Sequence, residues 1–553
     1  MTTVAHLVRG QWGDDRPGLF FEDRVLTHHE LAAGAAERAA LWTGLHREGE
    51  PHIGLLLDNE PEYVLWMQAA ALAGATVVGV NSTRRGADLA RDIRHSECAV
   101  VITNRTHAGL LDGLLDDGSE LGDIPVLVVD TAEYAALLAG QRGAPLPPDD
   151  GSVTEDTRFM ITFTSGSTGA PKAVPSTQGR IAASAAGMAR QFALSPESVC
   201  YIPMPLFHGN AVIANWAPAL HARAATALRR KFSASGFLSD VRRYGATYFT
   251  YVGRAISYIL ATPPHPADAA NPLTAGYGTE AGAVDRARFE ARFGCPLREG
   301  YGSSEGGVSF QWTPGTPDRA IGPAVPGLVV LDPETERECA RAQFDDTGRL
   351  LNGAEAIGEL VSTTPSSNFQ GYWRNPEATE ARLRQGRFWT GDLFYRDADD
   401  YLYFAGRGND WLRVDSENLA VHTIENILAR HDAFSAVAVY ATPDPAVGDL
   451  VMAAAVATPG AAFDPDRFAG FLAAQADLGT KMPPRFVRVL DAMPVTATSK
   501  TDKNGLRREG WRTNDPVWWQ PERDAAYRVM TDDDRALLAK AFAEHDRSHL
   551  LED

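Results

Sequence analysis

Residues 164–174 read Thr164-Ser165-Gly166-Ser167-Thr168-Gly169-Ala170-Pro171-Lys172-Ala173-Val174, and this stretch decides how the rest of the chain is interpreted. It follows the apolar run Phe159-Met160-Ile161-Thr162-Phe163, whose β-branched and aromatic residues are typical of a strand. Glycines permit a close approach of the backbone, while hydroxyls, N–H groups and the compact charge of Lys172 suit phosphate oxygens. The stretch therefore predicts a strand followed by a phosphate-binding loop.

Two other interpretations of this loop can be weighed on its sequence. A Walker A loop requires Gly directly before the Lys, whereas this chain has Pro171 before Lys172. A flexible Ser/Gly-rich linker fits the hydroxyls and the glycines. However, a linker seldom follows a buried strand directly and seldom ends in Pro-Lys followed by apolar residues. A phosphate loop is therefore the better interpretation.

Length and charge limit the classes of protein to which the chain can belong. With 553 residues, of which 44% are hydrophobic, the chain has enough apolar side chains to fill two or more domain cores. Its formal net charge of −19 at pH 7 would repel a nucleic-acid backbone, so no nucleic-acid partner is expected. A nucleotide site in such a chain must carry its own local positive charge.

The cysteines and the apolar runs indicate a soluble cytoplasmic protein. Its four cysteines are Cys98, Cys200, Cys295 and Cys339. No two of them form a Cys-x-x-Cys pair, which disfavours a zinc site and a disulfide scaffold. Residues 1–15 lack the apolar core of a signal peptide, and the longest weakly polar run, residues 69–80, is shorter than the ~20 residues of a membrane-spanning helix. No transmembrane segment is therefore expected.

Strand and helix patterns alternate along the first part of the chain. Strands are expected at residues 53–57, 76–80, 99–102 and 125–129, and a helix at residues 60–73. Thr27 and Glu30 have the spacing of a capping box, so another helix should begin at His28, which we expect to be exposed. Residues 116–155 have the composition of a surface connection. The alternation predicts the α/β class, with a doubly wound parallel sheet covered by helices.

Further motifs lie beyond the phosphate loop. His208 follows Met204-Pro205-Leu206-Phe207, and a lone histidine in an apolar setting is more often structural than functional. The glycine-rich stretches at residues 276–280 and 300–306 do not fit the dinucleotide fingerprint, because the third glycine falls at the wrong offset. Chemistry alone leaves these residues open between structural and functional roles.

The motifs together resemble those of the adenylate-forming enzymes, a family that includes acyl-CoA synthetases, aryl-CoA ligases, luciferases and the adenylation domains of peptide synthetases. Five motifs occur in the family's order, at residues 164–174, 205–208, 300–306, 388–392 and 403–407, and a sixth segment, Pro494 to Lys500, resembles the loop of the family's catalytic lysine. The resemblance covers essentially the whole chain and is closest to bacterial fatty-acid CoA ligases related to fatty-acid transport proteins. It implies cleavage of ATP to AMP and pyrophosphate.

The resemblance assigns roles to single residues. It implies that the phosphates of ATP are bound by Thr164, Ser165, Gly166, Thr168, Lys172 and Ser304. The implied nucleotide site also includes Gly278 and Thr279. Adenine stacks on Tyr301, the ribose is bound by Asp392 and Arg407, and His208 lines the acyl pocket of the catalytic site. Glu305 is the implied ligand of Mg²⁺, and a carboxylate suits this role because Mg²⁺ is typically held by one or two carboxylates together with substrate phosphates.

Two domains are implied by the same resemblance. Residues 1–408 form a large N-terminal domain of doubly wound sheets, and residues 409–553 form a smaller, mobile α+β domain. In this family the smaller domain rotates after adenylation about a hinge, here at Asn409-Asp410. Its Lys500 would stabilise the charge that gathers when a carboxylate attacks the α-phosphate. Lys503 is expected to be a solvated neighbour.

The resemblance defines less well which molecule accepts the acyl group in the second half-reaction, which follows adenylation. CoA is expected, which gives a ligase that uses ATP, Mg²⁺, CoA and a fatty or aryl acid. Thioester-forming members usually have Gly where this chain has Ser416, and a side chain there could narrow the pantetheine tunnel or strain the backbone. The alternative is a CoA-independent enzyme, for example an ATP-dependent diazotase that activates nitrite for an aromatic amine. A non-catalytic nucleotide- or acyl-binding protein is a second alternative, and the oligomeric state stays open.

Overall fold

The chain folds into two compact units. The first comprises residues 1–309 and 366–381, and the second comprises residues 310–365 and 382–553. The predicted domain boundary at residue 408 stays a prediction. The computed structural model describes residues 2–115, 121–122, 124–164, 172–279, 281, 283–346, 348, 350–364, 369–407, 411–414, 417–445, 449–475, 478–479, 481–496, 500–523, 525–545 and 547–551.

The first sheet of the first unit has the strand order β6-β5-β3-β4-β7-β8. Its strands are β3 (His52–Leu56), β4 (Thr76–Gly79), β5 (Val100–Thr103), β6 (Val126–Val128), β7 (Arg158–Thr164) and β8 (Lys172–Thr177). Neighbouring strands are parallel except for β8, which is antiparallel to β7. The strands predicted at residues 53–57, 76–80, 99–102 and 125–129 are therefore confirmed, with ends that differ by at most one residue.

The strands of a second sheet that lie within the same unit follow the order β13-β12-β11-β9-β10-β1-β2. Its strands are β1 (Pro17–Phe21), β2 (Arg24–Thr27), β9 (Val199–Ile202), β10 (Ala225–Leu228), β11 (Tyr248–Val252), β12 (Ala275–Thr279) and β13 (Leu297–Gly302). All are parallel to their neighbours except β2, which forms a hairpin with β1. The predicted α/β class with largely parallel sheets is thereby confirmed.

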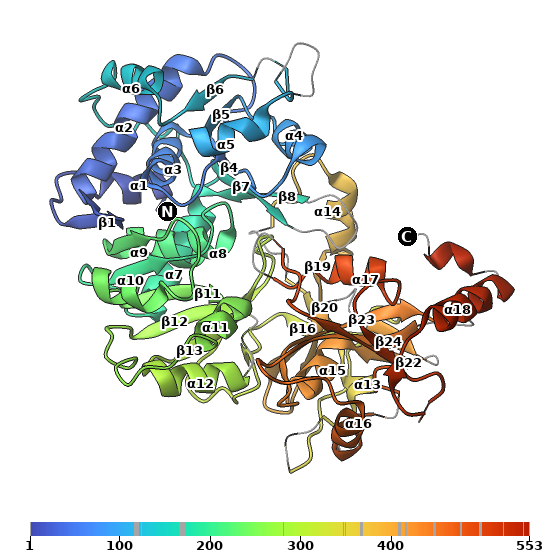
Figure 1. The fold of residues 1–553 in the computed structure, drawn as a ribbon. Coiled ribbons are helices and arrows are strands. Elements are labelled where there is room, and N and C mark those ends of the chain that lie inside the picture. The colour runs from blue at the N-terminus through green and yellow to red at the C-terminus, as the bar shows by residue number, and fades with distance from the viewer. Residues whose placement is uncertain are drawn as a thin grey trace. The chain divides into compact units, whose positions relative to one another are not determined.

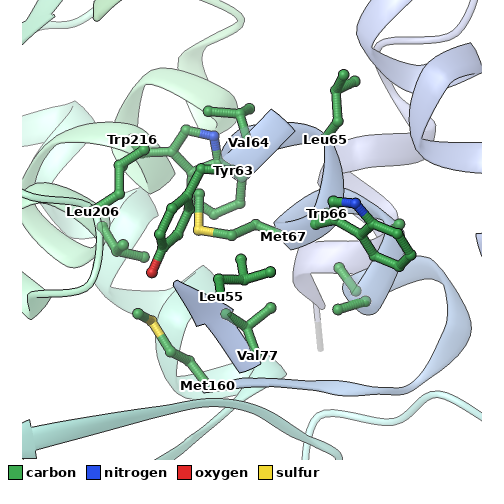
Figure 2. Packing of buried hydrophobic residues seen from close by; sticks show 14 of the residues in the cluster. Leu55, Tyr63, Val64, Leu65, Trp66, Met67, Val77, Met160, Leu206 and Trp216 are labelled. Atoms are coloured by element: carbon green, nitrogen blue, oxygen red, sulfur yellow. The ribbon is translucent and has the colours of Figure 1, made fainter. Parts of the chain in front are cut away.

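Helix α3 (Pro61–Ala73) is buried on nearly every side. Figure 2 shows its Tyr63 and Met67 packed with Leu206, Trp216 and Met160. Met160 comes from β7 of the first sheet, Leu206 from the loop after residue 202, and Trp216 from a helical segment. The same cluster contains Ile202 and Leu228 from strands of the other sheet, so one core cluster joins the two sheets. A helix that is apolar all round belongs inside a core, which explains why the first unit holds two sheets together.

Helix α2 (His28–Leu45) begins with the predicted capping box. The Glu30 N–H donates to the Thr27 hydroxyl at 3.0 Å, and the Thr27 N–H donates to the Glu30 carboxylate at 2.8 Å. The prediction that His28 is exposed was wrong, because its side chain is 2% exposed and its Nδ1 lies 3.2 Å from Oε1 of Gln11. The start of α2 lies against β1, which covers His28.

Further helices surround the two sheets of the first unit (Figure 1). Within the connection at residues 116–155, helix α6 contributes the buried Tyr134, so this connection is partly core rather than surface alone. The other helices of the unit are α1 (Val4–Arg9), α4 (Gly86–His95), α5 (Arg105–Ala108), α6 (Ala132–Ala139), α7 (Gln178–Gln191), α8 (Gly209–Ala211), α9 (Ala217–Ala222), α10 (Phe237–Tyr244), α11 (Gly253–Leu260), α12 (Ala283–Phe293) and α14 (Pro376–Arg382).

The second unit begins with an antiparallel sheet of order β15-β20-β19-β17-β16, which the sequence did not predict. Its strands are β15 (Gly322–Pro323), β16 (Leu328–Leu331), β17 (Gly358–Ser362), β19 (Arg387–Arg396) and β20 (Tyr401–Arg407), and β18 (Leu383–Arg384) pairs with β19. Strands β19 and β20 carry Asp392 and Arg407. This sheet therefore presents the two predicted ribose ligands.

The rest of the second unit is the predicted smaller α+β part. A five-stranded sheet is built from β23 (Phe434–Pro443), β24 (Asp449–Ala457), β25 (Phe486–Leu490), β26 (Val517–Trp519) and β27 (Arg528–Val529). The hairpin β21 (Trp411–Val414) and β22 (Glu417–Ala420) precedes it, and the helices are α13 (Gly353–Ala356), α15 (Val421–Leu428), α16 (Pro465–Ala474), α17 (Lys503–Glu509) and α18 (Asp532–Glu544). None of the helices within the described ranges has the length and apolarity to cross a membrane.

Candidate active site

The predicted phosphate loop joins two strands of the first sheet. Strand β7 ends at Thr164 and β8 begins at Lys172, and these two residues face each other across the antiparallel pair. The Thr164 hydroxyl donates to the Lys172 carbonyl oxygen at 3.5 Å. The predicted phosphate ligands Ser165, Gly166 and Thr168 lie outside the described residues. The structure therefore fixes both ends of the loop, and each end carries a group suited to phosphate.

Four predicted site residues lie near the carboxyl ends of parallel strands in the second sheet. Gly278 and Thr279 end β12, and Tyr301 lies near the end of its neighbour β13. His208 lies in the loop after β9, where its Nδ1 accepts a hydrogen bond from the Asn210 N–H at 3.3 Å. Ligands of open α/β sheets bind beyond the carboxyl ends of the strands. These residues therefore occupy the edge at which a ligand site is expected.

Loops and strands approach each other closely at this edge. The Oγ of Ser304 lies 3.9 Å from the position that a Cβ would take on Gly209, so the loops that carry His208 and Ser304 adjoin. A Cβ on Gly278 would lie 2.4 Å from the carbonyl oxygen of Tyr251 in β11. Only glycine permits such an approach of two backbones. The two loops therefore adjoin, and the end of β12 packs closely against β11.

The predicted magnesium ligand and the predicted phosphate lysine meet at a tyrosine. Tyr372 is 5% exposed and donates its hydroxyl to Oε1 of Glu305 at 2.8 Å. The Nζ of Lys172 lies 5.1 Å from the centroid of the same ring, which is within the range of a cation–π interaction. The first unit thus brings a carboxylate and an ammonium to a single side chain.

A buried arginine lies behind the loop of Ser304 and Glu305. Arg180, in α7, donates to the Ser304 carbonyl oxygen at 2.7 Å and to the Ser176 hydroxyl at 3.1 Å. Its guanidinium fills the space beside Gly306, whose φ is +69°. Burial lowers the pKa of Arg180 to about 10, and the charge of Glu305 opposes this shift. Arg180 is therefore still a cation at neutral pH and adds local positive charge to an acidic chain.

The surroundings of Glu305 fit a magnesium ion that is shared with a nucleotide. Among the described residues no group of three or more His, Cys, Asp or Glu side chains could hold a metal by itself. Mg²⁺ usually keeps several waters and is bound by one or two carboxylates plus substrate phosphates. A carboxylate has about four acceptor positions, so the bond from Tyr372 leaves Glu305 able to bind a cation. Glu305 beside Lys172 therefore fits Mg²⁺ bound together with phosphate.

The two predicted ribose ligands lie opposite each other in the second unit. Asp392 in β19 and Arg407 at the end of β20 are partners in the register of the antiparallel pair. The Asp392 N–H donates to the Thr390 hydroxyl at 3.1 Å, and that hydroxyl donates to the Leu360 carbonyl oxygen at 2.8 Å. The sheet thus brings together two residues that belong to separate motifs.

Lys500 lies at the end of a tight hairpin in the second unit. The Thr496 N–H donates to the Lys500 carbonyl oxygen at 2.7 Å, and the Lys500 N–H donates to the Thr496 hydroxyl at 3.2 Å. Val495 pairs with Thr501 across the same hairpin, and Asp502 caps helix α17 directly after it. The backbone of Lys500 is therefore held on both sides.

Lys503 is ion-paired, so the prediction that it is solvated was wrong. Its Nζ lies 2.8 Å from Oε1 of Glu425 in α15, and its side chain is only 20% exposed. The same carboxylate accepts the Val439 N–H at 2.8 Å and lies 3.7 Å from the ring of His422. Burial by itself would raise the pKa of Glu425, but the charge of Lys503 and the contact with His422 lower it to about 2.

Lys503→Met should lower the free energy of unfolding by about 2 kcal/mol. Removal of one partner from a fully buried pair costs about 3–5 kcal/mol, and this pair is partly exposed. Because the folded-state pKa of Glu425 is about 2 and its ordinary value is 4.5, the pair contributes fully above pH 4.5 and its contribution is lost as the pH falls toward 2. Urea titrations at several pH values should show a difference from the wild type that is constant near neutrality and shrinks in acid.

Lys540→Met is the matched control for this substitution. Lys540 forms an exposed pair with Glu544 at 3.5 Å, and its side chain is 72% exposed. Such i,i+4 pairs contribute about 0.3–0.5 kcal/mol. Equal losses of unfolding free energy in the two variants would show that the Lys503–Glu425 pair contributes no more to stability than an exposed ion pair does.

Sequence reasoning missed Tyr372 and Arg180, which contact the loop of Ser304 and Glu305, and Glu425, the partner of Lys503. Arg180 and Glu425 look like ordinary helix charges in the sequence. The aromatic pair Tyr372-Trp373 directly after Gly371 was a usable signal, because bulky residues behind a glycine turn often pack inward. Their contacts with the predicted residues are long-range, and no spacing rule reveals such contacts.

Comparison with known proteins gives matches over nearly the whole chain. The sequence model of the AMP-binding enzyme family matches residues 9–373, and that of the AMP-binding enzyme C-terminal domain matches residues 423–500. Steroid-22-oyl-CoA synthetase of Rhodococcus jostii (strain RHA1) is 46% identical over 552 residues, which cover 100% of this chain and 99% of that protein. The medium/long-chain-fatty-acid–CoA ligase FadD17 of Mycobacterium marinum (strain ATCC BAA-535 / M) is 45% identical over 508 residues, 92% of this chain and 96% of that protein.

Solved structures share the fold at lower identity. ATP-bound MatB from Rhodopseudomonas palustris has a TM-score of 0.79 and 22% identity, with 91% of this chain and 98% of that chain covered. The anthranilate CoA ligase AuaEII in complex with anthranoyl-AMP has a TM-score of 0.78 and 19% identity, with 91% and 96% covered. At these identities the likeness concerns the fold alone.

Proposed function

The chain belongs to the AMP-binding enzyme family, and on this premise we propose that it is an AMP-forming acid–CoA ligase whose acid is a steroid or fatty carboxylic acid. The structural observation that carries the proposal is the meeting of Glu305 and Lys172 at Tyr372. A carboxylate beside an ammonium suits a metal–nucleotide complex, in which the carboxylate takes the metal and the ammonium takes phosphate oxygens. ATP and CoA are the substrates that accompany the acid.

In the first half-reaction a carboxylate oxygen of the acid attacks the α-phosphorus of ATP. The bond to the bridging oxygen of the β-phosphate breaks, so acyl-AMP and pyrophosphate form. Lys172, Thr164 and Ser304 hold phosphate oxygens, Tyr301 stacks on adenine, and Asp392 with Arg407 holds the ribose. Mg²⁺, when bound at Glu305, neutralises phosphate charge. Lys500 stabilises the charge that develops on the transferring oxygens.

In the second half-reaction the thiol sulfur of CoA attacks the carbonyl carbon of acyl-AMP. The bond from that carbon to the AMP oxygen breaks, the thiol proton is lost to solvent, and the thioester and AMP leave. His208 lines the acyl side of the site, and its loop adjoins Ser304. The rotation of residues 409–553 about Asn409-Asp410 belongs to this proposal, and the hinge itself lies outside the described residues.

A cytoplasmic location is part of the same proposal. All four cysteines are free thiols. Burial raises the pKa of Cys98, Cys200 and Cys295 to about 12 and that of Cys339 to about 11. Unpaired thiols of this kind are typical of proteins in a reducing compartment.

The proposal is tested by product analysis over a panel of acids. With ATP, Mg²⁺ and CoA, a steroid C22 carboxylic acid or a medium- to long-chain fatty acid should yield AMP, pyrophosphate and the CoA thioester in equal amounts. Aryl acids should react more slowly, because the full-length relatives act on steroid and fatty acids. Coupled pyrophosphate release and mass spectrometry measure both products. ADP as the nucleotide product, or no turnover with any acid, would contradict the proposal.

The two alternative functions have less support. Both relatives named above are CoA ligases by name, and Ser416, the residue that suggested a CoA-independent reaction, lies outside the described residues. A non-catalytic binding protein has no need of Lys500, which this chain has on a well-anchored hairpin. Incubation with ATP, nitrite and an aminoaryl acid tests the diazotase alternative. A diazonium product there, with no thioester in the CoA arm, would favour the diazotase.

Ser416→Gly should leave thioester formation unchanged or raise it up to a few-fold. The substitution removes a side chain from the segment that follows the hinge, and glycine adopts every backbone conformation that serine does. Adenylation, measured as pyrophosphate release without CoA, should not change, because the two half-reactions use different faces of the mobile domain. Single-turnover thioester formation from supplied acyl-AMP makes the comparison. A marked loss of that step alone would mean that the serine side chain itself contributes to CoA binding.

A further inference from the structure

Tyr372 lies beside Lys172 although it comes from a distant part of the chain. Its segment, residues 366–381, belongs to the first unit although the stretches before and after it belong to the second. The Trp373 N–H donates to the carbonyl oxygen of Ala173, the residue after Lys172 in β8, at 2.8 Å. Figure 1 shows the yellow segment that leads into α14 near β8 and α4. The chain thus returns to the first unit and places a tyrosine beside Lys172, at the start of β8.

Contacts on both sides of Tyr372 fix its position. The indole N–H of Trp373 donates to the His95 carbonyl oxygen at 3.1 Å, and the His95 ring lies 3.0 Å from the Trp373 carbonyl oxygen. The Arg158 guanidinium lies 4.2 Å from the centroid of the Trp373 indole. The Tyr372 N–H donates to the Thr379 hydroxyl at 2.9 Å. The backbone is therefore anchored at this point, and the buried tyrosine side chain has a defined direction.

Two parts of the Tyr372 side chain interact with two different groups. The hydroxyl donates to Glu305 at 2.8 Å, and the ring lies 5.1 Å from the Lys172 ammonium. A hydrogen bond from a neutral donor orients a carboxylate without cancelling its charge, and the loss of such an outer partner typically lowers metal affinity 10- to 100-fold. A ring likewise holds a cation through its quadrupole without neutralising it. Neither contact therefore cancels the charge of Glu305 or that of Lys172.

We propose that Tyr372 is a positioning residue, whose hydroxyl orients Glu305 for Mg²⁺ and whose ring aligns Lys172 for the phosphates of ATP. The inference rests on the proposed function, because it takes Glu305 and Lys172 as the groups that bind metal and phosphate. The proposal gives the hydroxyl and the ring of Tyr372 two different effects on activity, whereas a tyrosine with a purely structural role would have no such separate effects. The hydroxyl governs the dependence on Mg²⁺, and the ring governs the affinity for ATP.

Two substitutions at this position divide the two effects. Tyr372→Phe removes only the hydroxyl, so the Mg²⁺ concentration for half-maximal pyrophosphate release should rise about tenfold. The KM for ATP at saturating Mg²⁺ should stay within about twofold of the wild type, because phenylalanine keeps the ring beside Lys172. Tyr372→Leu removes the ring as well, and its KM for ATP should rise about fivefold, the equivalent of about 1 kcal/mol of lost cation–π interaction.

Tyr134→Phe is a matched control in the same unit. Tyr134 is 3% exposed and donates its hydroxyl to a carboxylate, that of Glu62, at the same distance of 2.8 Å. It lies in α6, in the connection that precedes β7. The control loses the same kind of hydrogen bond, and its melting temperature should fall. Its Mg²⁺ dependence should equal that of the wild type.

The outcomes separate this inference from the proposed function. Wild-type Mg²⁺ dependence in Tyr372→Phe, or an equal shift in Tyr134→Phe, would overturn the role of the hydroxyl while the enzyme still forms AMP. If the wild type itself releases no pyrophosphate, the proposed function fails, and calorimetric ATP affinity with and without Mg²⁺ then tests Tyr372 on the same variants. If the leucine variant does not fold, the phenylalanine variant still decides whether the hydroxyl acts through Glu305.

Discussion

Lys500→Ala should lose adenylation by a factor on the order of 10² or more and should bind ATP nearly as well as the wild type. The reason is that the negative charge which the ammonium stabilises develops on the transferring oxygens only during the reaction. An interaction that is made mainly in the transition state lowers kcat and kcat/KM together and leaves ground-state binding intact. The hairpin that holds Lys500 leaves its backbone in place when the side chain is shortened.

The two half-reactions can be measured separately in this variant. Pyrophosphate exchange or release without CoA reports adenylation, and thioester formation from supplied acyl-AMP reports the second step. We expect the first to collapse and the second to remain within about threefold, because Lys500 acts on the phosphate transfer. ATP affinity measured by calorimetry completes the comparison.

Two further variants are compared with Lys500→Ala. Lys500→Arg keeps a positive charge but spreads it over a planar group, so it should recover only part of the rate. Lys540→Ala removes a lysine that is 72% exposed on α18 and should leave both half-reactions unchanged. Near-normal adenylation in Lys500→Ala would remove this residue from the mechanism.

The parallel strands could be predicted because their sequences are short, continuous and apolar. β3 and β4 are buried at every position, which is the pattern of strands covered on both faces. The sheet at residues 310–407 was not predicted, since strands as short as β15 and β16 lie among long loops and carry no clear periodicity. Its long strands β19 and β20 were recognised only as carriers of motifs.

The residues of the motifs were predicted, but most of their partners were not. A motif fixes which residue binds a ligand, whereas its orientation depends on whatever the fold brings next to it. Tyr372 lies 67 residues from Glu305 in the chain, and Lys503 and Glu425 come from different elements of the second unit. His28 shows the same limit, because its burial depends on β1, not on its own helix. Local patterns describe elements, and only the tertiary structure gives the neighbours.

The charges near the phosphate loop explain how an acidic protein can take a nucleotide. The chain carries a net charge of −19, yet Lys172 lies beside Tyr372 and the buried Arg180 contacts the loop of Ser304, where we propose that phosphate and metal bind. Glu305 is the acidic member of this group, and its charge favours the charged form of Arg180. On this proposal, the site without metal offers two cations to the phosphates of ATP and one carboxylate that would repel them.

Glu305→Gln should therefore change the response to Mg²⁺ more than it changes any other property. Glutamine keeps the length of the side chain and an oxygen that can accept from Tyr372, but it removes the charge that holds the metal. We expect kcat/KM at low millimolar Mg²⁺ to fall on the order of 10²-fold, because the charge stabilisation supplied by a bound metal amounts to several kcal/mol. In EDTA, where no metal is bound, ATP should bind the variant at least as well as the wild type, because a repulsive carboxylate has been removed.

The coupling between metal and nucleotide provides the decisive measurement. Calorimetric titration of ATP with and without Mg²⁺ gives the factor by which the metal raises ATP affinity, and this factor should be large in the wild type and close to one in Glu305→Gln. Glu290→Gln, at an exposed position of α12, should keep the wild-type factor. Glu305→Asp retains the charge but moves it away from Tyr372, so it should give an intermediate factor. If Mg²⁺ strengthens ATP binding equally in Glu305→Gln and in the wild type, the metal is held elsewhere and Glu305 only orients the loop beside Arg180.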